Sequence, residues 1–218
     1  MTMSSNTPSI LKLIATIRVH LQRRAATEDA VGREAAKVHS LLEPLPALDG
    51  EFSGSRHPST RHLNAALNAG DASTAALLAA VRPIALDLPW RYSYSKRDDS
   101  PGLEDNVSFA EIIGPDAPFK SQQVCLGLTL IGPATLYPSH VHPAIELYYV
   151  ASGTAAWIAN GATSLHSPGA FILHPSQVVH AMQTRQAPLL AVYSWSGEDV
   201  KTPSTYILSE PPWKAVGS

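Results

Sequence analysis

The chain carries two different hydrophobic patterns, which meet near residue 90. In the first part, apolar residues recur three or four positions apart, and this spacing places them on one side of an α-helix. The helical pattern covers residues 10–21, 31–42, 59–69 and 72–81. Ser9 and Thr27 are the candidate N-caps of the first two helices, and Pro44 limits the second. The pattern therefore predicts an N-terminal helical segment.

Beyond residue 90, short runs of alternating, β-branched or aromatic residues replace this pattern. Glycine, proline, asparagine and aspartate separate the runs at short intervals, which is typical of antiparallel sandwiches and barrels. The runs cover residues 92–95, 107–113, 123–131, 146–150, 155–159, 170–173, 189–195 and 206–208. We therefore expect a mainly β protein in which a helical segment, residues 1–90, packs on a β-barrel formed by residues 91–218.

The charge balance argues against polyanionic partners. The 218 residues include 16 basic and 18 acidic side chains, so the formal net charge is −2 and no strong field gathers nucleic acid or anionic lipid. Helices precede barrels in some transcription regulators, but residues 1–90 hold nine lysines and arginines against eight aspartates and glutamates, a poor DNA footprint. The longest apolar stretches are too short to cross a bilayer, so we expect no membrane partner and a cytoplasmic location.

The chemistry of the chain points to histidine rather than cysteine. Cys125 is the one cysteine, so it forms no intrachain disulfide and builds no cysteine-based zinc site. Among nine histidines, His140 and His142 stand apart because a single residue separates them and Glu146 follows. In one strand, these three side chains would share a face that points into the barrel, and the barrel could bring His180 opposite them. Three imidazoles and a carboxylate suit one divalent transition metal ion, with zinc, iron or manganese foremost and nickel or cobalt also compatible.

Two longer motifs include these residues. His140-Val-His142-Pro-Ala-Ile-Glu146 is followed after six further residues by Gly153, and Gly169 is followed by Pro175 and His180 at fixed intervals. The pair resembles the two motifs of the cupins over residues 124–196. This resemblance implies a cupin β-barrel, the double-stranded β-helix of jelly-roll type. Gln177 departs from the second motif, which usually has glycine there, and this difference affects loop shape more than ligand identity.

The aromatic residues around the motifs narrow the resemblance. Tyr137 precedes the first motif, Tyr148 lies two residues after Glu146, and Trp195 follows the second motif. With the helical segment in front, the chain is similar to the cupin-type dimethylsulfoniopropionate (DMSP) lyases, which split this zwitterion into dimethyl sulfide and acrylate. The resemblance implies that His140, His142, Glu146 and His180 hold the metal.

The same resemblance implies roles for the aromatic residues. Tyr148 would be the base that removes the proton α to the carboxylate, and it needs a nearby cation because an ordinary phenol has a pKa of about 10. Tyr137 and Trp195 would bind the sulfonium, since aromatic faces attract soft cations. Other interpretations stay open: a one-residue register slip would give the role of base to Tyr149, and Trp195 could be a core residue. Tyr137 could bind the carboxylate or only shape the turn before Pro138.

The remaining histidines and the helical segment have simpler interpretations. His174 is expected in a loop or at the surface, and solvated or capping roles are expected for His20, His39, His57, His62 and His166. The helical segment is expected to cover one end of the barrel or to mediate a homodimer. Because one barrel supports many reactions, two alternatives to a DMSP lyase remain: another metal-dependent cupin enzyme, such as a dioxygenase or sugar isomerase, and a non-enzymatic cupin that binds a small ligand.

Overall fold

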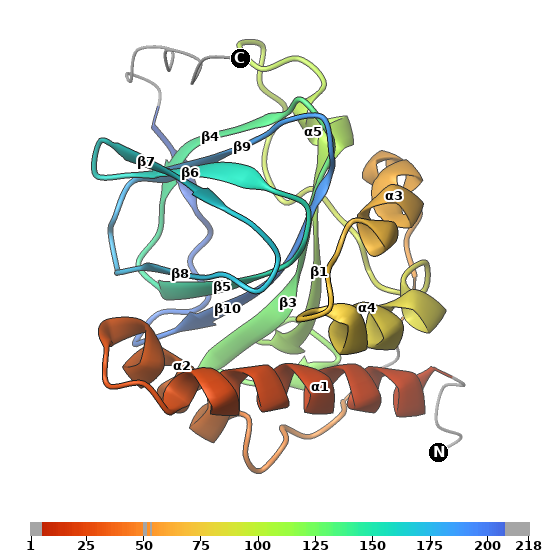
Figure 1. Cartoon of the computed structure of the whole chain (residues 1–218), viewed down its shortest axis with the longest axis vertical. Coiled ribbons are helices and arrows are strands. Elements are labelled where there is room, and N and C mark those ends of the chain that lie inside the picture. The colour runs from red at the N-terminus through yellow and green to blue at the C-terminus, as the bar shows by residue number, and fades with distance from the viewer. Residues whose placement is uncertain (1–5, 50–51, 53, 208–218) are drawn as a thin grey trace.

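The computed structural model describes residues 6–49, 52 and 54–207 (Figure 1). Its helices follow the apolar spacing of the sequence, although the segment predicted over 59–69 divides into a 3-10 turn and a short α-helix. The helices are α1 (Thr7–Ala25), α2 (Ala30–Leu41), the 3-10 helix η1 (Pro58–His62), α3 (Leu63–Asn68), α4 (Ala75–Val81), the 3-10 helix η2 (Arg82–Ile84) and α5 (Leu103–Asn106).

The helix starts differ from the predicted caps. Helix α1 begins before Ser9, and its N-cap residue Asn6 makes no side-chain cap. At α2, the Asp29 carboxylate accepts a hydrogen bond from the Gly32 amide at 2.7 Å, so Asp29 rather than Thr27 is the cap. A carboxylate at this position pairs an otherwise free amide and also interacts favourably with the helix dipole.

The strands form two facing sheets, the jelly-roll arrangement that the sequence predicts. They are β1 (Val107–Gly114), β2 (Phe119–Lys120), β3 (Val124–Ile131), β4 (Leu136–Val141), β5 (Ile145–Ser152), β6 (Ala155–Ala159), β7 (Ala162–His166), β8 (Phe171–His174), β9 (His180–Thr184), β10 (Leu189–Ser196) and β11 (Thr205–Tyr206). Within the described residues, one sheet has the order β2-β1-β3-β10-β5-β8 and the other β11-β4-β9-β6-β7. Neighbouring strands are antiparallel, apart from the short parallel pair of β1 and β2.

The strand predictions fail in three places. Residues 92–95 form no strand, because Tyr92 and Tyr94 pack their rings against other aromatic residues instead of joining a ladder. The predicted runs do not include β2, β4, β7 or β9, although the expected shared face of His140 and His142 requires a strand at β4. The run predicted over 206–208 overlaps β11 at Tyr206, Ile207 lies beyond the end of that strand, and Leu208 lies outside the described residues.

The N-terminal helices cover the outer face of the six-stranded sheet. Figure 1 shows α1 lying across the lower end of the barrel, with α4 beside it. Apolar residues of α1 such as Ile14 and Ile17 share one hydrophobic core with Leu126 and Leu128 of β3. Alternate residues of β3 face the barrel interior, so this strand is buried on both faces and its sequence shows no polar alternation. Among the described residues, no helix combines the length and apolar character needed to span a membrane.

Backbone conformation explains why three motif positions favour glycine. Gly153 and Gly169 have φ angles of 78° and 89°, in the left-handed region that side chains with a Cβ rarely adopt. Gln177 also has a positive φ, 63°, at the position where the cupin motif usually has glycine. Its amide donates a hydrogen bond to the His142 carbonyl at 3.0 Å, which ties the two motif loops together.

Candidate active site

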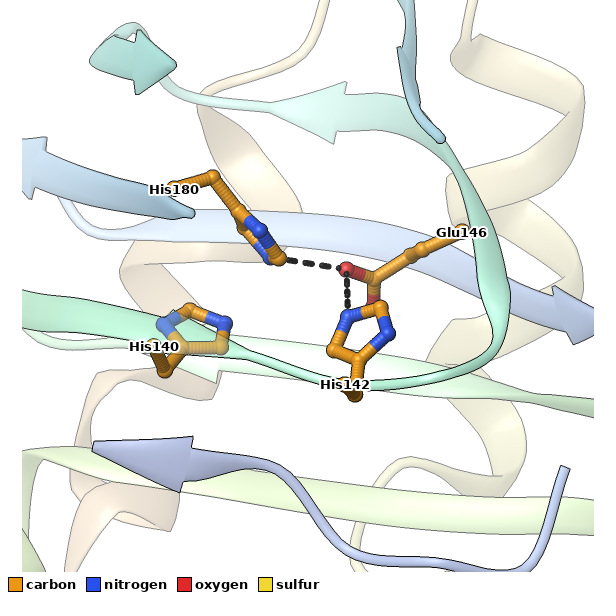
Figure 2. A group of neighbouring side chains, drawn as sticks. All are labelled: His140, His142, Glu146 and His180. Atoms are coloured by element: carbon orange, nitrogen blue, oxygen red, sulfur yellow. Dashed lines mark hydrogen bonds and ion pairs between the residues drawn. The ribbon is translucent and has the colours of Figure 1, made fainter. Parts of the chain in front are cut away.

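The four predicted metal-binding side chains meet between the two sheets (Figure 2). His140 in β4 and His180 in β9 are register partners on neighbouring strands of the five-stranded sheet. His142 lies in the connection after β4, and Glu146 lies on β5 in the other sheet. Two expectations are therefore wrong: Glu146 does not continue the strand of His140, and His180 lies beside His140 rather than opposite it. The chain turns between the sheets at Pro143, and this turn brings the carboxylate to face the imidazoles.

The geometry of this group is compact and buried. One ligand atom from each of the four side chains lies within 4.8 Å of all the others, and each side chain is almost inaccessible to solvent. The Nε2 atoms of His142 and His180 both lie 3.1 Å from Oε2 of Glu146, as the dashed lines in Figure 2 mark. We call His140, His142, Glu146 and His180 the histidine cluster. A buried group of three histidines and one glutamate with these spacings suggests a metal site.

The ring orientations fit a metal ion. The Nδ1 atoms of His140, His142 and His180 lie 2.8–2.9 Å from the backbone carbonyls of Pro138, Ala144 and Val178. A carbonyl only accepts hydrogen bonds, so each Nδ1 carries the proton, and in a neutral ring Nε2 then offers its lone pair. Two such lone pairs facing one carboxylate oxygen repel it, unless the imidazoles are protonated or a cation lies among them. The donor set therefore suits a divalent transition metal.

The electrostatics of the cluster point the same way. Burial alone would raise the pKa of Glu146, but hydrogen bonds that His142 and His180 donate when their rings are protonated hold the pKa of this carboxyl well below its usual value. Burial would likewise lower the pKa of His142, yet the Glu146 carboxylate raises it. Burial and the neighbouring His180 lower the pKa of His140 well below its usual value, so that ring is neutral. Glu146 is thus an ionised, buried carboxylate that needs positive charge nearby.

Trp195 and Tyr137 each contact a member of the cluster. The indole N–H of Trp195 donates a hydrogen bond to Oε1 of Glu146 at 2.7 Å, and its ring lies 4.4 Å from that of His142. Tyr137 stacks on His140 with ring centroids 4.2 Å apart, and its hydroxyl hydrogen-bonds that of Tyr94 at 2.8 Å. Trp195 therefore fixes the carboxylate, and Tyr137 holds one imidazole ring.

A cavity of about 180 Å³ opens beside the cluster. It is lined by four groups of residues: cluster members His140 and Glu146; aromatic residues Tyr94, Phe109, Tyr137, Tyr148, Tyr193 and Trp195; charged residues Arg91, Glu111, Asp116 and Lys201; and Ser93, Pro115, Cys125, Val200, Pro203 and Ser204. All three predicted aromatic site residues thus line the same space as His140 and Glu146 of the candidate metal site. The cavity suits a small ligand that has both polar and apolar parts.

Residues 148 and 149 point to opposite sides of β5. Tyr148 lines the cavity, and burial followed by the Glu146 charge raises its pKa well above the usual value. Tyr149 faces the helices instead, where its hydroxyl lies 3.0 Å from Nδ1 of His20. The register thus brings Tyr148, and not Tyr149, to the cavity.

Two histidine expectations are wrong. His174 lies in β8 rather than in a loop or at the surface, it is 2% exposed, and neither ring nitrogen has a hydrogen-bond partner among the described residues. Its ring stacks on His180 with centroids 4.0 Å apart. His20 is buried and paired with Tyr149 rather than solvated. The capping role is confirmed for His57, whose side chain accepts a hydrogen bond from the Ser59 amide.

Sequence reasoning missed several residues of the cavity wall. The sequence pattern predicts Tyr94 within the strand 92–95 and Tyr193 within the apolar run 189–195, so neither residue stands out as part of a site. Glu111 had a usable signal, because it is the single charged residue within the apolar strand β1. A lone carboxylate at such a position requires a partner or a ligand.

Comparison with known proteins places the chain in a family. The model of the dimethylsulfoniopropionate lyase family matches residues 30–191. The chain belongs to this family. DddL of Cereibacter sphaeroides, which carries the name of a dimethylsulfoniopropionate lyase, is 34% identical over 144 residues, or 65% of this chain and 60% of DddL. The dimethylsulfoniopropionate lyase DddQ of Ruegeria pomeroyi is 29% identical over 110 residues, which are 50% of this chain and 55% of DddQ. The chain therefore spans less than two thirds of these curated relatives.

Solved structures of DMSP lyases share the fold. The crystal structure of DddQ from Ruegeria pomeroyi DSS-3 has a TM-score of 0.75 at 23% identity and covers 94% of this chain and all of that one. A structure described with the DMSP lyases RdDddP and RnDddQII gives the same TM-score at 22% identity, with 93% of this chain and all of that one covered. The cupin-like fold with N-terminal helices is thereby confirmed.

Proposed function

We propose that this member of the DMSP lyase family cleaves dimethylsulfoniopropionate into dimethyl sulfide and acrylate. The observation that carries the proposal is the position of Tyr148, which lines the same cavity as Glu146 and His140 of the histidine cluster. A hydroxyl that can act as a base therefore lies beside a site suited to a divalent cation. Family membership supplies the substrate class.

The proposed reaction is a β-elimination. Tyr148, as phenolate, accepts the proton from the carbon next to the substrate carboxylate. The electrons of the broken C–H bond form the C=C bond of acrylate, and the C–S bond breaks with its electron pair left on sulfur. Dimethyl sulfide, acrylate and one proton are the products. A divalent cation held by His140, His142, Glu146 and His180 would supply positive charge that stabilises the carboxylate as negative charge develops on it.

The other residues of the site orient these partners. Trp195 holds the Glu146 carboxylate through its indole N–H, so the cluster keeps its geometry. We propose that the faces of Trp195 and Tyr137 also contact the sulfonium, which attracts aromatic rings without requiring a hydrogen bond. The positive charges of the cation and the sulfonium both favour the phenolate form of Tyr148. The donor set of the cluster favours zinc, iron or manganese.

Dimethyl sulfide in the headspace over purified, metal-reconstituted protein tests this function. We expect release that requires both DMSP and a divalent metal. Tyr148→Phe should lower the rate by about 100-fold or more, because it removes the proton acceptor. Tyr149→Phe is the matched control: it makes the same change one residue away, on the face turned towards α1, and should keep most of the activity.

Two results would overturn the proposal. One is the absence of release with zinc, iron and manganese, which would favour another cupin enzyme or a ligand-binding protein. The other is equal activity of Tyr148→Phe and Tyr149→Phe, which would remove Tyr148 from the chemistry. Turnover of another substrate that stops only without oxygen would indicate a dioxygenase.

A further inference from the structure

The cavity wall includes a carboxylate, that of Glu111, which does not belong to the histidine cluster. Glu111 of β1 projects into the cavity from the six-stranded sheet. Its carboxylate lies over Gly114, where a Cβ atom would collide with it, and near the sulfur of Cys125. Oε1 of Glu111 is buried and has no hydrogen-bond partner among the described residues. A buried carboxylate oxygen in this state is costly unless a positive charge approaches it.

Strand register connects Glu111 to the proposed base. Glu111 pairs with Gly127 of β3, Gly127 pairs with Tyr193 of β10, and Tyr193 pairs with Tyr148 of β5. Residues paired in this way lie in one row on the same face of the sheet. Gly127 has no side chain, and the Tyr193 ring occupies the space that a Cβ atom there would need. The side chains in this row are therefore, in order, the Glu111 carboxylate, the Tyr193 ring and the Tyr148 ring.

The cations near Glu111 lie at the rim rather than inside. The guanidinium of Arg91 is 3.8 Å from Oε2 of Glu111, but the Arg91 side chain is 55% exposed, against 18% for Glu111. Lys201 is also exposed. Burial raises the pKa of Glu111 even though Arg91 opposes the shift, which shows that the rim cation only partly compensates the buried charge. A cation bound inside the cavity would therefore stabilise the remaining negative charge of the Glu111 carboxylate.

We propose that Glu111 recognises the cationic end of the substrate, so that the cavity selects short zwitterions with a carboxylate at the histidine cluster and a sulfonium towards β1. A sulfonium carries a positive charge but no N–H or O–H group, so it interacts with a carboxylate through charge and not through a conventional hydrogen bond. Oε1 of Glu111, which accepts no hydrogen bond from the described residues, is available for this interaction. The aromatic wall that begins with Trp195 and Tyr137 continues towards Glu111, because the Phe109 ring lies 5.8 Å from that of Tyr137 and 6.4 Å from that of Tyr193 between ring centroids. The methyl groups of the sulfonium contact this wall. This assignment rests on the proposed function for its substrate class, and it adds a specificity-determining residue outside the metal cluster.

Binding of two matched ligands tests the assignment. The first is DMSP, and the second is 4-methylpentanoate, which has the same shape and carboxylate but a neutral CH in place of the sulfonium sulfur. Both are titrated calorimetrically into metal-loaded protein with the Tyr148→Phe substitution, so that cleavage does not interfere. We expect Glu111→Gln to raise the Kd of DMSP about tenfold and to change that of 4-methylpentanoate by no more than about twofold.

Asp116→Asn provides the matched control. It removes a carboxylate at the exposed rim of the same cavity and should leave both Kd values within about twofold of their starting values. Equal weakening of both ligands by Glu111→Gln would overturn the proposal, because it would indicate a structural role. An unchanged Kd for DMSP, or a parent protein that binds DMSP no more tightly than 4-methylpentanoate, would also overturn it.

This experiment is independent of turnover. If the wild-type protein releases no dimethyl sulfide but Glu111→Gln still weakens DMSP selectively, the lyase proposal fails and the recognition by Glu111 stands. If release occurs and the selective effect is missing, the lyase proposal stands and Glu111 has another role. The two proposals therefore fail in different measurements.

Discussion

Tyr148 and Tyr149 are adjacent in β5, and their side chains reach two different compartments of the protein. Tyr148 lines the cavity beside Glu146, whereas Tyr149 crosses the helix–sheet interface to the His20 ring, with its hydroxyl 3.0 Å from Nδ1. Successive side chains of a strand point to opposite faces. The same alternation thus supplies a residue for the site and a residue that attaches α1 to the barrel.

The His20–Tyr149 pair predicts a pH-dependent stability. Burial, reinforced by Arg23, lowers the pKa of His20 below its ordinary value of 6.5, so the unfolded chain takes up this proton more readily than the folded protein. The contribution of His20 is therefore fully present above pH 6.5 and is lost as the pH falls from there towards the lowered folded pKa. Urea unfolding at pH 7.5, 6.5 and 5.5 should show a smaller loss of stability for His20→Asn than for wild type. Identical pH profiles would contradict this prediction.

Metal removal should destabilise the protein. A ligand that binds only the folded state at a concentration 100 times its Kd adds about 2.7 kcal/mol to the free energy of unfolding. Chelation should therefore lower the Tm of wild-type protein, whereas His180→Ala should show little response because one of the four clustered side chains is missing. His174→Phe is the matched control, since it keeps a ring against His180 and removes only unpaired nitrogens. A full chelator response in His180→Ala would exclude His180 as a ligand.

Trp195 should influence metal affinity through Glu146. Trp195→Phe keeps an aromatic ring near His142 but removes the N–H that donates to Oε1 of Glu146. Loss of such a supporting hydrogen bond typically weakens metal binding by about 10- to 100-fold. Competition with a chromophoric chelator measures the change. Trp157→Phe should have little effect on metal affinity, because its indole nitrogen has no partner among the described residues.

The left-handed backbone at two loop positions predicts opposite effects of substitution. Gln177→Gly should raise the free energy of unfolding by about 0.5 kcal/mol, since relief of the strained φ of 63° slightly exceeds the entropy cost of glycine. Gly153→Ala should lower the free energy of unfolding by more than about 1 kcal/mol, because the new Cβ would collide with the carbonyl of Pro188. Chemical denaturation of both variants measures the two values, and a stabilising Gly153→Ala would contradict the reported backbone.

The sequence alone determined the class of fold and all four members of the candidate metal site. Helical and strand periodicities separate clearly near residue 90, because a helix face repeats every 3.6 residues and a strand face every two. The cupin spacing around His140, His142, Glu146 and His180 identified a group that the structure brings within 4.8 Å. It also located Tyr148, since a residue two positions after Glu146 on a strand shares its face.

Only the tertiary structure decided how these residues meet. The turn between β4 and β5 moves Glu146 into the opposite sheet, and the pairing of β4 with β9 brings His180 beside His140. His174 and His20 are buried by packing against elements distant in sequence, which no local pattern reveals. Glu111 and Tyr148 line the same cavity because the register of β1, β3, β10 and β5 places them in one row across the sheet. Periodicity along the chain determines which face a side chain points to, but the partners on that face depend on contacts between distant segments.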